Sequence, residues 1–106
     1  MTQQNVRSPK CPLAASVELI DVQTNARFKT RTSDVSVVGC YLDTMSPLPL
    51  GTKVRLKISH CDLMITVSGV IAQSQPNRGM GIRFIDISLD DHEILEAWLV
   101  AALARG

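Results

Sequence analysis

The stretch Asp34-Val35-Ser36-Val37-Val38-Gly39 joins the end of one predicted β-strand to the start of the next. It combines a carboxylate, a hydroxyl and a glycine, and glycine is unfavourable inside a helix because it loses much conformational freedom on folding. Aspartate and serine side chains also hydrogen-bond nearby backbone groups in turns. We therefore predict a strand-to-strand turn at residues 34–39, here called the corner, whose polar groups suit a polar ligand.

The residues on both sides of the corner alternate between apolar and polar side chains, as strands do. The alternation is clearest in residues 52–59, where three apolar residues share one face and three basic residues share the other: Val54, Leu56 and Ile58 against Lys53, Arg55 and Lys57. Six strands are expected, at residues 14–21, 26–34, 40–42, 52–59, 63–73 and 81–86. Short strands at this regular spacing predict an all-β fold, a six-stranded antiparallel β-barrel.

Residues 89–104 have the spacing of a helix instead. Ser88 is placed to cap the helix, and Asp91 stands three residues later in the capping-box position. Apolar residues recur at helical spacing and predict a stripe that closes one end of the barrel: Leu95, Trp98, Leu99, Ala102 and Leu103. The rest of the last turns is almost as apolar. That surplus fits a homodimer or partner contact through the helix, and it fits equally a helix that uses alanine as a good helix former.

Length and charge set further bounds. A chain of 106 residues is enough for one domain, and a net charge of +1 gives no overall attraction to nucleic acid or membranes. No apolar run approaches the roughly 18 residues that cross a bilayer. The first residues lack the features of a secretory signal, so a cytoplasmic location is expected. We predict a flexible N-terminal arm at residues 1–12 and one domain at residues 13–106.

The three cysteines, Cys11, Cys40 and Cys61, are widely spaced and form no C-x-x-C pair. That pattern disfavours a disulfide framework and suits a reducing compartment. His60 and His92 do not complete a metal-ligand pattern with them, and no spacing places a nucleophile beside a base and an orienting carboxylate. We therefore expect no catalytic residues, no metal and no cofactor, and the chain is not predicted to be an enzyme.

The corner resembles the D/N-x-S-x-x-G signature of PilZ domains, small bacterial receptors for the second messenger cyclic diguanylate (c-di-GMP). Residues 48–56 look like the family's proline-glycine lead into its fourth strand, and residues 80–88 look like its last strand before the helix. The resemblance covers nearly all of the chain. It implies a six-stranded split barrel with a C-terminal helix, and a nucleotide-binding sensor that couples c-di-GMP to a downstream partner protein.

The resemblance also implies which residues bind the ligand: Arg7, Lys10, Asp34, Ser36 and Gly39. Cations of the arm would meet the phosphates of c-di-GMP, and guanidinium groups would also stack on its bases. The Asp34 carboxylate would accept hydrogen bonds from a guanine edge, Ser36 would bond either the ligand or its own turn, and Gly39 would allow close backbone approach.

The arm departs from the family pattern, which carries an R-x-x-x-R motif before the first strand. Val6 stands where the first arginine of that spaced pair belongs, and Lys10 stands where the second belongs, while Arg7 keeps its guanidinium. Lysine can meet a phosphate as a point charge but cannot form two parallel hydrogen bonds. The departure favours an alternative function, a degenerate PilZ domain that binds no nucleotide and serves as a protein-protein interaction adaptor.

A second basic cluster lies within the strands. Arg27, Lys29 and Arg31 share one face of their strand, and with Lys53, Arg55 and Lys57 they would form a basic outer patch. Such a face is more often solvated barrel exterior. Readers of nucleic acid usually interleave aromatic residues for stacking, and few aromatics are present here. We expect no nucleic acid polymer as a partner and no membrane insertion.

Overall fold

The computed structural model describes residues 10–104, which form seven strands and one helix. A two-residue strand comes first, followed by six longer strands and the helix: β1 (Cys11–Pro12), β2 (Ser16–Asp21), β3 (Arg27–Val35), β4 (Gly39–Asp43), β5 (Lys53–His60), β6 (Leu63–Gln75), β7 (Gly79–Ile87) and α1 (Leu89–Ala104). The predicted order of six main strands followed by a helix is confirmed.

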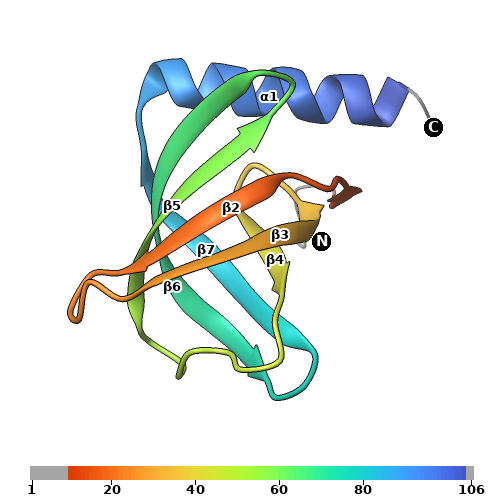
Figure 1. Ribbon diagram of the computed structural model, residues 1–106. Coiled ribbons are helices and arrows are strands. Elements are labelled where there is room, and N and C mark those ends of the chain that lie inside the picture. The colour runs from red at the N-terminus through yellow and green to blue at the C-terminus, as the bar shows by residue number, and fades with distance from the viewer. Residues whose placement is uncertain (1–9, 105–106) are drawn as a thin grey trace, which may run out of the picture.

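The six longer strands close into an antiparallel barrel (Figure 1). Neighbours run in the order β3-β2-β5-β6-β7-β4, and pairing between β3 and β4 closes the ring. An unbroken ladder joins β5 to β6, and a two-residue turn at Cys61 and Asp62 connects these strands. Both turn residues have positive φ angles, 52° and 64°, as hairpins of this kind require. The predicted six-stranded antiparallel barrel is therefore confirmed for residues 10–104.

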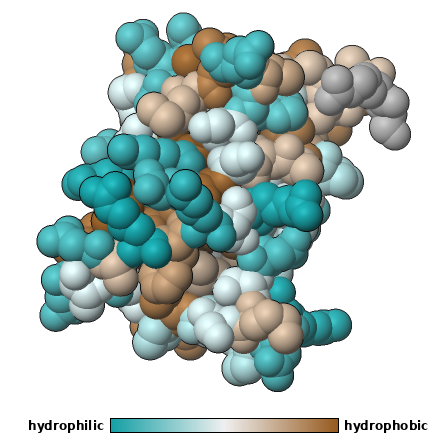
Figure 2. Space-filling view, viewed as in Figure 1, coloured by the Kyte–Doolittle hydropathy of each residue, from teal (hydrophilic) through white to brown (hydrophobic). Residues whose placement is uncertain are grey.

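The barrel interior holds one apolar core built by the alternation of each strand. Val54, Leu56 and Ile58 of β5 are each at most 1% exposed, whereas the basic residues between them point outward. Leu42 and Ile65 from other strands are fully buried beside them. Figure 2 shows the hydrophilic residues that gather on the outside over β2 and β3. The period of two in the sequence therefore separates the core from the outer wall.

Helix α1 lies across one end of the barrel (Figure 1). Its start is capped as predicted, because the Ser88 hydroxyl accepts a hydrogen bond from the Asp91 N–H at 3.1 Å. The Asp91 carboxylate in turn accepts from the Thr66 N–H of β6 at 3.0 Å, which ties the helix to the barrel. Within residues 10–104, no helix is both long and apolar enough to span a membrane.

Leu95, Trp98 and Leu99 of α1 are buried against the barrel, as the apolar stripe predicted. Leu103, placed on the same stripe, is 55% exposed. The difference has a geometric reason, since the last turn of α1 extends past the edge of the barrel (Figure 1). The stripe therefore covers less of the barrel than its length in the sequence predicts.

The short strand β1 lies against the end of β3, with Cys11 opposite Val35 and Pro12 opposite Asp34. A buried hydroxyl holds the segment after it, because Thr32 Oγ1 accepts from the Ala15 N–H at 2.9 Å and donates to the Leu13 carbonyl. The sequence predicts a flexible N-terminal arm at residues 1–12. Its last two residues form β1, and residues 1–9 lie outside the described part of the chain.

Candidate functional site

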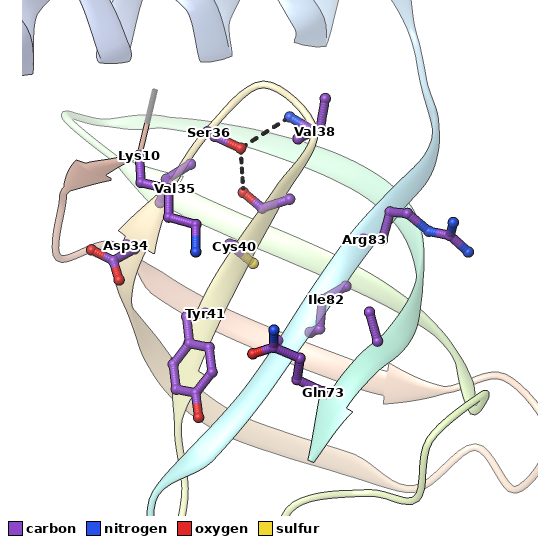
Figure 3. A pocket seen from close by; sticks show the side chains of 13 residues that line it. Lys10, Asp34, Val35, Ser36, Val38, Cys40, Tyr41, Gln73, Ile82 and Arg83 are labelled. Carbon is purple, nitrogen blue, oxygen red and sulfur yellow. Dashed lines mark hydrogen bonds between the residues drawn. The ribbon is translucent and has the colours of Figure 1, made fainter. Parts of the chain in front are cut away.

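A hollow of about 480 Å³ lies beside the corner, on the wall formed by β3, β4, β7 and the end of β6 (Figure 3). We call it the corner pocket. Four of the five predicted ligand-binding residues line it: Lys10, Asp34, Ser36 and Gly39. The fifth, Arg7, lies outside the described residues. The fold thus brings the residue before β1 and the corner motif to one place.

Ser36 uses its polar groups to hold the turn of the corner. Its N–H donates to the Gly39 carbonyl at 2.8 Å, and its hydroxyl accepts from the Val38 N–H at 3.2 Å. The hydroxyl also donates to the Gly39 carbonyl at 3.4 Å, and the residue is only 4% exposed. Of the two roles expected for Ser36, the hydrogen bonds match the one within its own turn, which fixes the shape of the corner.

Gly39 allows two strands to approach closely. A Cβ atom at this position would lie 2.3 Å from the Ile82 carbonyl oxygen of β7. The corner is also fastened to β7 by a hydrogen bond from the Phe84 N–H to the Val38 carbonyl at 2.8 Å. Gly39 therefore allows the close backbone approach that was expected, and the backbone that approaches it is β7, which forms one wall of the pocket.

Lys10 and Asp34 supply charged groups of opposite sign at one side of the corner pocket (Figure 3). Lys10 is exposed, and it immediately precedes β1, whose Pro12 pairs with Asp34. Asp34 is half-buried, and no residue between 10 and 104 donates a hydrogen bond to its carboxylate. As far as residues 10–104 are concerned, the carboxylate can accept hydrogen bonds from a ligand.

Glycine at position 81 accounts for the hollow. The strand register places Tyr41 of β4 opposite Gly81 of β7, and Gln73 of β6 opposite the same glycine on its other side. Because Gly81 has no side chain at the centre of this row, a gap remains between the Tyr41 ring and the Gln73 side-chain amide. Tyr41 is held by its hydroxyl, which donates to the side-chain oxygen of Gln75. Its ring offers a planar wall on which a base can stack.

Among the lining residues that sequence reasoning missed, three carry long polar side chains: Tyr41, Gln73 and Arg83. Alternation along β4 places Tyr41 on the same face as Gly39, and this signal was available in the sequence. Gln73 and Arg83 required knowledge of which strands are neighbours. In Figure 3 the Arg83 side chain extends away from Asp34, at the opposite side of the pocket. Among residues 10–104, no group of three histidine, cysteine or acidic side chains is placed to hold a metal ion.

Cys40 lines the pocket wall but faces the core, and burial raises the pKa of its thiol to about 12. Because the thiolate is the reactive form, we expect iodoacetamide at pH 8 to alkylate the exposed Cys61 and to leave Cys40 unmodified. Cys40 should stay largely unmodified at pH 9 as well, since that pH is still far below its pKa and the thiolate remains a very small fraction of the folded protein. Mass spectrometry of tryptic peptides measures both sites. After unfolding in urea Cys40 should react like Cys61, and equal rates in the folded protein would contradict the burial.

The comparisons with known proteins agree with this geometry. A family model described as PilZ domain matches residues 2–101. No curated protein matches the chain. Among solved structures, the PilZ domain of CeSA from a cellulose-synthesizing bacterium aligns with a TM-score of 0.70 and 20% identity, over 89% of this chain and 97% of that one.

Two further solved structures share the fold at lower identity. The PilZ domain of YcgR from Escherichia coli with c-di-GMP aligns with a TM-score of 0.72 and 11% identity, over 96% of this chain and 94% of that one. The Bacillus subtilis inhibitor of motility, MotI/DgrA, aligns with a TM-score of 0.79 and 14% identity, over 97% of this chain. The alignment spans 53% of the MotI/DgrA chain. At these identities the three structures show the fold.

Proposed function

Since the chain belongs to the PilZ domain family, a family of c-di-GMP receptors, we propose that its corner pocket binds c-di-GMP and that binding is passed on to a partner protein. The observation that carries the proposal is the convergence of Lys10 and Asp34 on one pocket beside the family's corner motif. A cation and a free carboxylate match a ligand that has both phosphates and guanine N–H groups.

Each predicted ligand-binding residue has a role in this proposal. Lys10 meets a phosphate as a point charge, and Arg7 contributes the guanidinium that the family resemblance assigns to the ligand. Asp34 accepts hydrogen bonds from a guanine edge, and the Tyr41 ring stacks on a base. Ser36 and Gly39 keep the corner in the shape that presents Asp34, through the hydrogen bonds and the close backbone approach described above.

The size of the pocket supports a nucleotide ligand. A volume of about 480 Å³ falls within the roughly 300–1,000 Å³ typical of small-molecule sites. The module then acts as a cytoplasmic sensor that binds and signals without catalysis, in keeping with the regulatory character of the family.

A second candidate function is a protein-interaction adaptor that retains the barrel and has lost the nucleotide. The observation that favours it is the arm, in which Val6 and Lys10 replace the family's spaced arginines. Exposed apolar residues of α1 supply a surface for such contacts, since Val100 is 66% exposed and Leu103 in the last turn is 55% exposed.

Isothermal titration of the full chain with c-di-GMP tests the two functions against each other. The sensor predicts a dissociation constant in the micromolar range or below and loss of the heat signal on Arg7→Ala. The Lys53→Ala variant is a matched control, because Lys53 is an exposed lysine on β5 outside the pocket. GTP at the same concentration should give no heat. No heat from c-di-GMP at millimolar concentration would overturn the sensor and leave the adaptor.

A further inference from the structure

Among the strands that the structure describes, β3 leaves about half of one edge open. The ladder between β3 and β4 covers only Thr32, Asp34 and Val35 of β3, so no strand within residues 10–104 pairs with residues 27–30 on that side. The Thr32 N–H bonds the Ala15 carbonyl on the β2 side. Alternation along the strand then directs the N–H and C=O groups of Lys29 and Arg27 toward the open edge. Unpaired strand edges of this kind are templates for an added strand.

A groove of about 480 Å³ runs beside this edge and shares no lining residue with the corner pocket. We call it the edge groove. Phe28, Leu48 and Met80 contribute its apolar surface, and the Phe28 side chain is left 41% exposed. Figure 2 shows hydrophobic residues directly beside the hydrophilic band over β2 and β3. The unpaired stretch of β3 ends at Thr30, whose hydroxyl donates a hydrogen bond to the Asp43 carbonyl of β4.

The outer face of the same edge is positive. Arg27, Lys29 and Arg31 all point outward, and Glu18 of β2 shares this outer face with them. The exposed Asp43 lines the edge groove, so two acidic residues stand against these three cations and Lys57. Glu18 lies 3.5 Å from Arg27 and 4.0 Å from Lys57, so its charge is divided between two cations. Lys29 and Arg31 make no ion pair within the described residues. A partner strand laid on this edge therefore meets an excess of positive charge.

We propose that the open edge of β3 binds an extended acidic segment of a partner protein, which adds to the barrel as a further strand. Residues directly opposite each other in paired strands point to the same side. The segment's residues opposite Arg27 and Lys29 would thus be acidic, and the residue opposite Phe28 would be apolar and enter the edge groove. The occupant is a segment in which acidic and apolar residues alternate, and main-chain hydrogen bonds supply much of the affinity.

The probe for this proposal is a fluorescein-labelled peptide of eight residues in which glutamate alternates with valine, measured by fluorescence anisotropy with the full chain. Lys29→Glu should weaken binding by about tenfold or more, because it places like charges opposite each other. Lys53→Glu makes the same charge change on β5, away from the groove, and should weaken binding by less than about threefold. Phe28→Ala should weaken binding through the lost groove contact.

Two peptides separate strand addition from simple charge attraction. A peptide with N-methyl groups on alternate residues keeps its charges and loses the donors for pairing, so it should not bind. A peptide with the glutamates and valines in separate blocks should bind at least about tenfold more weakly. Hydrogen exchange should show slower exchange of the Lys29 amide on binding of the alternating peptide.

Several results would overturn the proposal. One is that Lys29→Glu and Lys53→Glu weaken binding of the alternating peptide equally. Another is that the N-methylated peptide binds as tightly as the unmodified peptide. A third is an oligothymidylate of eight nucleotides that binds the same residues as tightly as the peptide, since this would make the face a general polyanion site. Because the edge groove is separate from the corner pocket, c-di-GMP binding by Lys29→Glu should be unaffected, so failure of this proposal is distinguishable from failure of the sensor function.

Discussion

Replacing Gly39 with alanine is expected to lower the free energy of unfolding by about 3 kcal/mol, the upper end of the range for overpacked sites. The added Cβ would lie 2.3 Å from the carbonyl oxygen of Ile82, and that oxygen belongs to backbone. Ile82 is itself paired on both sides, to Cys40 and to Ile71, so it cannot move away without disturbing two ladders. In a domain of this size the midpoint of thermal unfolding should fall by roughly 15 °C.

Urea unfolding followed by the fluorescence of the buried Trp98 measures this change. Gly81→Ala is the matched control, because there the nearest atoms are side-chain atoms of Gln73 at 3.3 to 3.5 Å, so Gln73 has to give by only a few tenths of an ångström. Its stability should change by less than about 1 kcal/mol, although its new methyl group enters the corner pocket. If Gly39→Ala were as stable as Gly81→Ala, the close approach of β4 to β7 would not be required by the fold.

Replacing Asp34 with alanine is expected to weaken c-di-GMP binding by about tenfold to a hundredfold. The reason is the loss of charge-assisted hydrogen bonds to guanine, each contributing about 1.5 to 3 kcal/mol. Stability should be nearly unchanged, since no residue between 10 and 104 donates to the carboxylate and the backbone pairing of Asp34 with Pro12 and Tyr41 remains. Calorimetry with the purified variant measures the affinity, and thermal unfolding confirms that the barrel is intact.

Asp43→Ala is the control for this substitution. Asp43 is an exposed aspartate at the other end of β4, where it lines the edge groove and not the corner pocket. The Asp43→Ala variant should bind c-di-GMP as the unmodified chain does.

The double variant Val6→Arg and Lys10→Arg, which restores the family's spaced arginines, should bind c-di-GMP more tightly than the unmodified chain. Equal affinities of Asp34→Ala and the unmodified chain would remove Asp34 from the ligand contacts.

Local patterns in the sequence determined most of the fold. The alternation in Lys53–His60, the capping serine at position 88 and the turn residues between strands predicted six strands and a helix, and the structure confirms them. These signals are local because side-chain alternation and helix capping depend on residues only a few positions apart. The corner motif likewise identified the family from residues 34–39 together with its flanking strands.

The tertiary structure alone decided where side chains meet. The row of Tyr41, Gly81 and Gln73 that forms the corner pocket, the pairing of β1 with β3 and the open edge at residues 27–30 all depend on which strands are neighbours and in which register. The alternation of apolar and polar residues assigns each residue to a face of its strand. It does not determine which residue of a strand distant in the sequence lies opposite. That register is set by packing of the whole core, so the ligand-binding surface emerges only when the barrel closes.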